Sequence, residues 1–434
     1  MKIYLTALGC RLNQAEIETL ARSVQAAGHH VAARPEEADW AIINTCTVTH
    51  IATRKSRQLI RHLRALNPHL RLAVTGCYAQ ISADELQAIE GVDLIAPNAD
   101  KGRLVERLLA LSPSKGAPPA TASSAAPGLL GHTRAFVKVQ DGCDNHCAYC
   151  IVAIARGPQR SRPPAEVLSE VRARVAEGYQ EAVLTGVHIG AYGRDSAPDA
   201  PLAPSAGWSL ARLIREILEA TTMRRVRLSS IEPWDLSPEL VSLWPNPRLC
   251  RQVHLPLQSG CDAILRRMGR KYSAQQFEEL VGAIRRRVPA ASITTDVIVG
   301  FRGESEEEHK ASLKFVERMR FSRLHVFKYS PRPGTPAANM PGQIPAAVTQ
   351  ARSEAMIALG RRLARDYHGR FVGEEVEVLC ESAREEGGMR LWTGLTDNYL
   401  RVTLPSSEDL ANALVRVRCL TADEAGLRGE LLRA

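Results

Sequence analysis

The sequence has no long hydrophobic run. None of its stretches approaches the roughly 20 consecutive apolar residues that a membrane-spanning helix needs. The first residues, MKIYLTALGC, contain one lysine and a short apolar stretch that ends at a Gly-Cys pair. That stretch is too short for the core of a secretory signal peptide. We therefore expect a cytoplasmic protein with no membrane partner.

Lysine is absent from residues 369–434, which contain eight arginines and twelve acidic residues and so carry a net charge of −4. The whole chain carries +9, which leaves +13 for the rest. RNA-binding proteins present clustered arginine and lysine side chains to phosphates. Such clusters occur at residues 54–64, 156–162, 266–271 and 285–287, and for the last we expect a solvated helix face. The sequence thus allows an RNA partner, but not one held by the bulk charge of the acidic segment.

Structural disulfides are not expected either, because the cytosol keeps thiols reduced. The useful question is which of the ten cysteines are metal ligands. Four of them have no ligand spacing, and we interpret them as packing residues: Cys250, Cys261, Cys380 and Cys419. The other six form two triplets.

The pattern of strands and helices divides the chain into three domains and a linker. Residues 1–111 alternate strands with helices, which predicts a parallel α/β domain. Residues 112–130 (SPSKGAPPATASSAAPGLL) have no periodicity and predict a linker. Residues 131–366 contain six strand–helix units, which predicts a (β/α)6 partial TIM-like barrel with its chemistry at the C-terminal ends of the strands. Residues 369–434 predict a small antiparallel β-barrel.

The expected strands are short runs rich in apolar and β-branched residues. They lie at residues 2–8, 40–43, 70–74 and 92–96 in the first domain, at 135–140, 182–185, 226–230, 252–257, 292–299 and 323–329 in the second, and at 375–380, 400–404 and 414–420 in the third. The predicted fold class is therefore α/β for the first two domains, followed by an all-β domain.

One cysteine triplet follows the expected strand at 135–140, in the segment DGCDNHCAYC. Its spacing is Cys143-x-x-x-Cys147-x-x-Cys150. Three thiolates in one loop can bind three irons of a 4Fe-4S cubane and leave the fourth iron open to a small-molecule ligand. The alternative is a zinc site, which normally takes four ligands and would recruit His146. We favour the open cluster.

The other triplet consists of Cys10, Cys46 and Cys77, each just after a different expected strand. In a parallel sheet the C-terminal ends of the strands share one edge, where open α/β folds place their ligands. A single cysteine in such a place is more often a small buried core residue. Three in equivalent places indicate a second cluster with one free iron.

These triplets and the motifs between them resemble the methylthiotransferase family of radical S-adenosylmethionine (SAM) enzymes over nearly the whole chain. The resemblance also rests on TGVHIGAYGRD, LSSIEPWD, HLPLQSGCDAILRRMGR, TTDVIVGF and FKYSPRPGTPA in the central domain, and on GLTDNYLRV, which resembles the family's C-terminal TRAM motif. The chain has Ala153 and Arg302 where the family usually has proline. Neither position supplies a cluster ligand.

The resemblance implies two 4Fe-4S clusters: an auxiliary cluster on the first-domain triplet and a SAM-cleaving cluster on the central triplet. It implies that SAM serves both as methyl donor and as source of a 5′-deoxyadenosyl radical. It also implies an electron donor such as flavodoxin or ferredoxin. Within the family, LGCRLNQAE, LTGVHIGAYG and SSIEPWDL are most similar to the branch that acts on threonylcarbamoyladenosine.

That branch implies methylthiolation of a tRNA adenosine adjacent to the anticodon, with the anticodon arm of tRNA as partner. The alternatives within the family are isopentenyladenosine in tRNA and an aspartate of a ribosomal protein. An alternative of another class is a zinc-containing RNA-binding module without catalytic activity.

Several further residues are candidates for contact with SAM. Tyr149 fits the radical SAM signature, because it is the aromatic residue just before the last cysteine. Gly186 and Gly190 lack side chains and would let the backbone approach SAM. Glu232 follows a strand and would accept a hydrogen bond from a ribose hydroxyl.

Two more candidates lie at the ends of later strands. Gln258 and Asp296 would contact SAM or the base. For all of these residues the alternative is a polar side chain that fixes a turn or caps a helix. For His188 and His254 we expect a structural role, since a lone histidine more often satisfies a hydrogen bond in the core.

Overall fold

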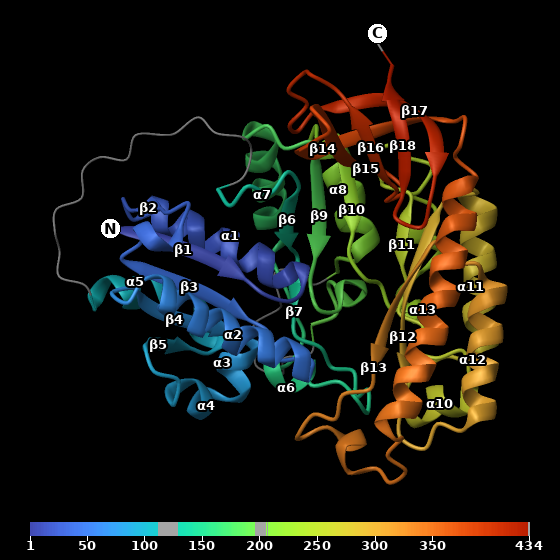
Figure 1. The fold of residues 1–434 in the computed structure, drawn as a ribbon, viewed down its shortest axis with the longest axis horizontal. Helices are drawn as coiled ribbons and strands as arrows, with labels where there is room; N and C mark the ends of the chain where they lie inside the picture. The colour runs from blue at the N-terminus through green and yellow to red at the C-terminus, as the bar shows by residue number, and fades with distance from the viewer. Residues whose placement is uncertain (112–128, 196–204, 206, 433–434) are drawn as a thin grey trace.

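The computed structural model describes residues 1–111, 129–195, 205 and 207–432, and these residues form three parts (Figure 1). Most of the predicted linker lies outside the described residues. No helix of the described ranges is both long and apolar enough to cross a membrane.

The first part is a parallel sheet of five strands in the order β2-β1-β3-β4-β5. Its strands are β1 (Lys2–Ala7), β2 (His30–Val31), β3 (Trp40–Thr45), β4 (Arg71–Gly76) and β5 (Val92–Ala96). Its helices are α1 (Arg11–Ala26), α2 (His50–Leu66), α3 (Cys77–Ile81), α4 (Ala83–Gln87), η2 (Asn98–Arg103) and α5 (Leu104–Ala110). Alternate strand residues face opposite sides: Ile42 packs with α1 and α5, and Ile43 packs with α2. Both faces of the sheet are therefore covered.

The central part has six parallel strands around an open barrel. They are β6 (Ala135–Lys138), β9 (Glu181–Thr185), β10 (Arg225–Leu228), β11 (Gln252–His254), β12 (Ser292–Val299) and β13 (Arg323–Lys328). They form two three-stranded sheets, which a parallel bridge between Ser230 and His254 connects. The described residues show no pairing of β6 with β13, so the barrel is partial, as predicted.

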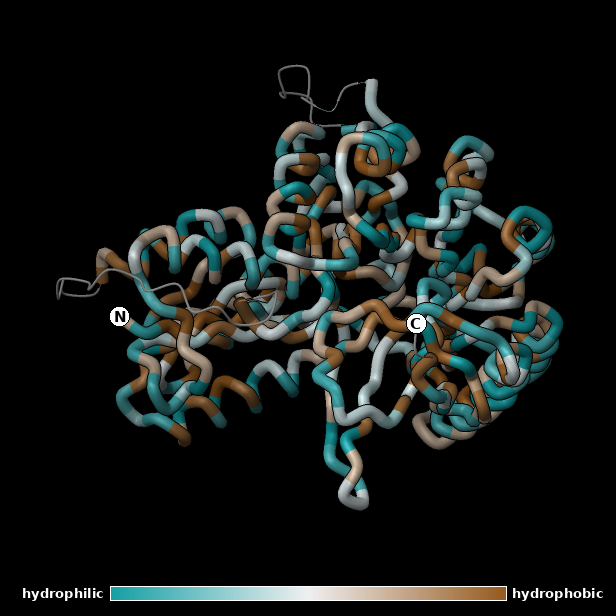
Figure 2. The backbone as a smooth tube through the Cα atoms, turned by 90° about the horizontal axis from the view of Figure 1, so that it is seen from above, coloured by the Kyte–Doolittle hydropathy of each residue, from teal (hydrophilic) through white to brown (hydrophobic). Residues whose placement is uncertain are grey.

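Helices cover the outside of this barrel. They include α7 (Pro164–Ala176), α8 (Leu210–Ala220), α11 (Ala274–Arg287), α12 (Glu306–Met319) and α13 (Ala346–Gly369). The short strands β7 (Gln140–Asp141) and β8 (Arg160–Ser161) and the short helices α6 (Val152–Arg156), α9 (Pro238–Val241) and α10 (Asp262–Arg267) lie in the connections. Seen from above, hydrophobic stretches concentrate inside each part, and the outer loops are mostly hydrophilic (Figure 2).

The third part is a closed barrel in the order β14-β15-β16-β18-β17. Its strands are β14 (Glu375–Glu386), β15 (Met389–Thr396), β16 (Arg401–Pro405), β17 (Leu414–Ala422) and β18 (Leu427–Leu431). Strands β15 and β18 were not predicted from the sequence. The barrel is antiparallel except where β16 pairs with β18. The predicted fold class is confirmed.

Two arginines attach this small barrel to the N-terminal ends of the central strands. Arg225 donates to the carbonyl of Leu395 (3.0 Å), and Arg227 donates to the carbonyl of Thr396 (3.0 Å). The first part instead lies beside β6 and β7, with α1 against the barrel (Figure 1). The C-terminal ends of the central strands are thus left for the site.

Candidate active site

The first cysteine triplet lies at the ends of three neighbouring strands. Cys10 follows β1, Cys46 follows β3 and Cys77 follows β4, and these strands are adjacent in the sheet. A Cβ atom placed on Gly9 would come within 2.7 Å of the Cβ of Cys46, so the loop that carries Cys10 lies against Cys46. Cys10 is exposed, whereas Cys46 and Cys77 are buried. The predicted convergence at one sheet edge is what the structure shows.

Glycines set the close approach of these loops. Gly9 and Gly76 directly precede cysteines and have φ of +97° and +99°, which side chains rarely allow. A Cβ on Gly76 would collide with the carbonyl oxygen of Thr45. In the other triplet Gly142 precedes Cys143, and its φ is +70°. The Gly-Cys pairs are a signal that the sequence analysis did not use.

The second triplet lies in the loop between β7 and α6. Hydrogen bonds within the loop and to another segment hold this loop in place. Within the loop, the amide of Cys150 donates to the carbonyl of Cys147 (3.0 Å), and the amide of Ala148 donates to the carbonyl of Met268 (2.9 Å), which lies outside the loop. The amide of Asn145 also donates to the sulfur of Cys143 (3.4 Å). All three cysteines of this triplet are half-buried.

The donor sets of both triplets suit iron–sulfur clusters, which take thiolate ligands. In a cubane each thiolate binds a different iron, so the ligands stand farther apart than those of a single ion. Among the described residues, no three His, Cys, Asp or Glu side chains form a group that could hold one metal ion. Each triplet supplies three thiolates, so one iron of a four-iron cubane would have no cysteine ligand from that triplet.

Burial favours the protonated form of Cys46, Cys77, Cys147 and Cys150 in the absence of a cluster. It raises the pKa of Cys46 to about 11 and that of Cys150 to about 12. Two cations oppose this effect. Burial raises the pKa of both Cys77 and Cys147. Arg156 offsets part of this effect at Cys77, and Arg270, whose Nη1 lies 3.5 Å from the sulfur of Cys147, offsets part of it there. Each triplet therefore has one arginine that favours a thiolate.

Arg270 also connects the triplet to a predicted SAM contact. It donates to the carboxylate of Glu232 and lies 4.8 Å from the ring centre of Trp234. Tyr149 packs against the apolar cluster of Met268 and Phe301, and burial raises the pKa of its phenol well above its usual value.

Gly186 and Gly190 lie on the loop after β9. A Cβ on Gly186 would come within 2.7 Å of the carbonyl oxygen of Gln140. A Cβ on Gly190 would collide with Asp235. Both glycines thus admit neighbouring protein groups, and their contact with SAM stays a prediction.

Gln258 and Asp296 are brought together. The amide of Gln258 donates to the carbonyl of Asp296 (2.8 Å), with Gln258 at φ +65°. The carboxylate of Asp296 lies 3.3 Å from Nε2 of His254, whose other ring nitrogen lies 2.8 Å from the hydroxyl of Thr294. Burial, above all, lowers the pKa of the adjacent His325 to about 4. His254 thus satisfies hydrogen bonds, as expected, but lies beside a candidate site residue.

His188 contacts both Asp235 and Cys143, and the sequence did not reveal either contact. Its Nε2 lies 2.5 Å from the carboxylate of Asp235, and its Nδ1 lies 4.0 Å from the sulfur of Cys143. Burial lowers the pKa of His188, but hydrogen bonds to Asp235 and Cys143 raise it to about 9. An imidazolium therefore stands next to a candidate cluster ligand.

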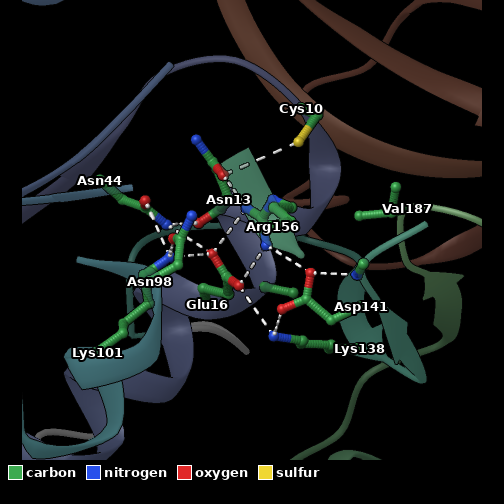
Figure 3. Close-up of polar contacts among 12 residues, drawn as sticks. Cys10, Asn13, Glu16, Asn44, Asn98, Lys101, Lys138, Asp141, Arg156 and Val187 are labelled. Atoms are coloured by element: carbon green, nitrogen blue, oxygen red, sulfur yellow. Dashed lines mark hydrogen bonds and ion pairs between the residues drawn. The ribbon is translucent and has the colours of Figure 1, made fainter. Parts of the chain in front are cut away.

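A buried group of charges joins the first part to the central part (Figure 3). Its centre is Glu16 of α1, which accepts hydrogen bonds from Lys101 (2.5 Å), Arg156 (2.8 Å) and Lys138 (3.0 Å). Lys101 belongs to η2, whereas Lys138 and Arg156 belong to the central part. One carboxylate thus binds cations from both sides of the interface.

Arg156 extends this group toward both triplets. It donates to Asn13 (2.7 Å) and to Asp141 (3.0 Å). Asn13 in turn lies 3.9 Å from the sulfur of Cys10, and Asp141 is two residues before Cys143. Arg156 is buried, so the RNA-binding cluster predicted at 156–162 does not include it.

Two family models match the chain. Residues 2–97 match Uncharacterized protein family UPF0004, and residues 137–316 match the Radical SAM superfamily. The chain is also 36% identical over 442 residues to the threonylcarbamoyladenosine tRNA methylthiotransferase MtaB of Bacillus subtilis, with 98% of this chain and 95% of that protein covered. The chain belongs to the radical SAM methylthiotransferases. The predicted family and the prediction of an enzyme are confirmed, against the alternative of a non-catalytic zinc module.

This methylthiotransferase is similar to other members too. It is 33% identical to the tRNA-2-methylthio-N(6)-dimethylallyladenosine synthase of Desulfitobacterium hafniense, with 99% and 97% of the two chains covered. Its fold is similar to that of the radical SAM methyltransferase TsrM from Kitasatospora setae in complex with tryptophan and a SAM analogue. The TM-score is 0.55 at 15% identity, with 78% and 75% covered, which shows the fold alone. Family membership implies a 4Fe-4S cluster and SAM.

Proposed function

We propose that this enzyme attaches a methylthio group to the adenine ring of threonylcarbamoyladenosine, next to the anticodon of tRNA, with two 4Fe-4S clusters. The observation that carries the proposal is the first triplet: Cys10, Cys46 and Cys77 meet at one sheet edge, and the Glu16 group connects that edge to the SAM-type triplet. The choice of substrate follows the activity for which the relative from Bacillus subtilis is named.

The cysteines divide between two roles. The first-part triplet would hold the auxiliary cluster, and Cys143, Cys147 and Cys150 would hold the SAM-cleaving cluster. When bound, these groups supply a sulfur that carries the methyl group and an electron for reductive cleavage of SAM. The protein holds the loops in place, and Arg270 partly offsets the burial that raises the pKa of Cys147.

The candidate contacts to SAM surround the central triplet. Glu232 is oriented by Arg270, so that one face of its carboxylate is already occupied. Tyr149 lies in the same loop as the cysteines. Gln258 and Asp296 come from the other half of the barrel and would approach the base from there. A reductant of the flavodoxin or ferredoxin class completes the proposal.

Basic residues near the first triplet suit a tRNA backbone. Arg54, Lys55 and Arg61 on α2 are exposed, and in the part of the chain that the structure describes none of them forms an ion pair. Helix α2 begins four residues after Cys46. By contrast, Arg270 of the predicted cluster at 266–271 is buried and faces Glu232. We therefore assign phosphate binding to α2 rather than to Arg270.

The test is mass spectrometry of tRNA nucleosides from a host that lacks this activity, with and without the gene. Gain of a methylthio group on threonylcarbamoyladenosine is the expected result. A methylthio group on isopentenyladenosine would refute the substrate and keep the reaction. Unchanged tRNA, with active clusters in the purified protein, would refute tRNA as substrate and favour the ribosomal-protein aspartate.

The number of clusters needs a separate measurement. Iron in anaerobically purified protein should be about eight atoms per chain, from two four-iron clusters. Replacing all three cysteines of either triplet by alanine should remove about half of the iron. If the first-part variant keeps all its iron, there is no auxiliary cluster on those cysteines.

A further inference from the structure

Three guanidinium groups surround one tyrosine between the three parts of the molecule. Tyr399 lies between β15 and β16 at φ +67°. Its hydroxyl lies 2.8 Å from Nη2 of Arg11. The guanidinium carbons of Arg11, Arg134 and Arg227 lie 5.4, 5.8 and 4.9 Å from its ring centre. Arg11 directly follows Cys10, so this cluster borders the proposed auxiliary site.

The carboxylates around this cluster do not balance its charge. Arg227 makes two hydrogen bonds to Glu181 (2.6 and 3.0 Å), and Arg134 makes one to Glu381 (2.7 Å). Arg11 forms no ion pair within the described ranges. Nη1 of Arg134 is buried without a hydrogen-bond partner among the same residues. Three cations thus face two carboxylates.

The surrounding groups respond to this excess of positive charge. Burial raises the pKa of Tyr399, but Arg11, Arg134 and Arg227 lower it below its usual value. An uncompensated cation away from bulk water is costly. An anion bound beside Arg11 would supply the missing negative charge.

The cluster also adjoins a cavity of suitable size. Arg134 and Tyr399 line a cavity of about 300 Å³, together with Ser292 and Thr294 of β12. Thr294 lies 2.8 Å from a ring nitrogen of His254, which contacts Asp296. Thr294 therefore connects the lining of the cavity to His254 and Asp296, the second of which is proposed to meet SAM or the base.

We propose that Arg11, oriented by Tyr399 and assisted by Arg134, binds the carboxylate of the threonylcarbamoyl group and so determines the choice of modified adenosine. The inference rests on the proposed function. The threonyl substituent ends in a carboxylate, for which a guanidinium offers paired donors, whereas an isopentenyl substituent is apolar and would leave Arg11 unpaired.

The test measures binding rather than turnover. Anticodon stem–loop RNAs would carry threonylcarbamoyladenosine, its methyl ester or plain adenosine, and dissociation constants would be measured anaerobically with the holoenzyme. The wild type should bind the acid about tenfold or more tightly than the ester. Arg11→Gln should abolish that difference and leave the affinity for plain adenosine unchanged. Arg286→Gln, an exposed arginine on α11, is the matched control and should keep the difference.

Two further variants keep the inference testable if Arg11→Gln fails to fold. Arg11→Lys keeps the charge but not the paired donors, and should retain part of the preference for the acid. Tyr399→Phe removes the hydroxyl that orients Arg11 and should also reduce the preference. Equal binding of acid and ester by the wild type, or an unchanged preference in Arg11→Gln, would overturn the inference. The nucleoside assay separates the two failures: if it shows threonylcarbamoyladenosine as substrate, only the role of Arg11 is lost.

Discussion

Replacement of Glu16 by glutamine should weaken the junction between the first part and the central barrel. The carboxylate is 5% exposed and holds Lys101, Arg156 and Lys138. The variant keeps the shape of the side chain. It leaves Asp141 as the carboxylate partner of Lys138 and Arg156, and it takes from Lys101 the carboxylate that binds it. Removal of one partner from a buried ion pair typically costs about 3–5 kcal/mol. We expect a loss of that order in the free energy of unfolding.

Denaturant-induced unfolding at neutral pH, followed by limited proteolysis, would measure this loss. The control is Glu317→Gln, which breaks an ion pair with Arg362 whose side chains are more than half exposed and should cost less than about 1 kcal/mol. Adding Lys101→Met to Glu16→Gln removes a surplus cation and should restore part of the stability. A Glu16→Gln variant as stable as the control would refute the electrostatic account of this interface.

The pH dependence follows from the same residue. Burial raises the pKa of Glu16, but Lys101, Arg156 and Lys138 hold it well below its usual value of 4.5. A carboxyl group whose pKa is lower in the folded than in the unfolded protein stabilises the folded state at pH values above its unfolded pKa. This stabilisation is lost as the pH falls through the pKa that the group has in the folded protein. The difference in stability between the wild type and Glu16→Gln should therefore be constant near neutral pH and shrink only in acid.

Three further predictions concern other contacts of the site. Gly76→Ala places a Cβ against the carbonyl oxygen of Thr45 and should cost about 1–3 kcal/mol and lower the iron content, as measured by unfolding and iron analysis. His188→Ala removes a positive charge near Cys143 and should lower the reduction potential of the cluster that we place there, as followed by an anaerobic redox titration; an unchanged potential would contradict the contact. Arg227→Ala removes the hydrogen-bonded partner of the fully buried carboxylate of Glu181 and should detach the C-terminal barrel, seen as faster proteolysis between the two parts.

Local sequence patterns were sufficient for the strands that carry ligands. The runs that end at Cys10, Cys46 and Cys77 are continuous and apolar, and parallel pairing then places their ends at one edge. The strands β15 and β18 were missed for the opposite reason. Each is interrupted by a glycine, Gly394 or Gly429. In β15 buried and exposed residues do not alternate cleanly, and β18 has only five residues.

The environment of the ligands was not predictable in this way. Glu16 lies 85 residues from Lys101 and 140 from Arg156 in the sequence, and no local pattern indicates that they share one carboxylate. For the same reason the sequence placed Arg156 and Arg270 among surface cations. Burial, which decides whether an arginine meets a phosphate or a carboxylate, is a property of the packed parts.

These two buried arginines share a position relative to the cysteines. Burial raises the pKa of Cys77 and of Cys147, and Arg156 and Arg270 partly offset this effect. Each arginine is itself bonded to a carboxylate, Glu16 or Glu232. Thiolates bound to a cluster keep negative charge that a dry interior must compensate. A carboxylate that orients the arginine, and an arginine that faces the sulfur, would meet this need at both triplets. The two cysteine sets therefore share an electrostatic design, although their folds differ.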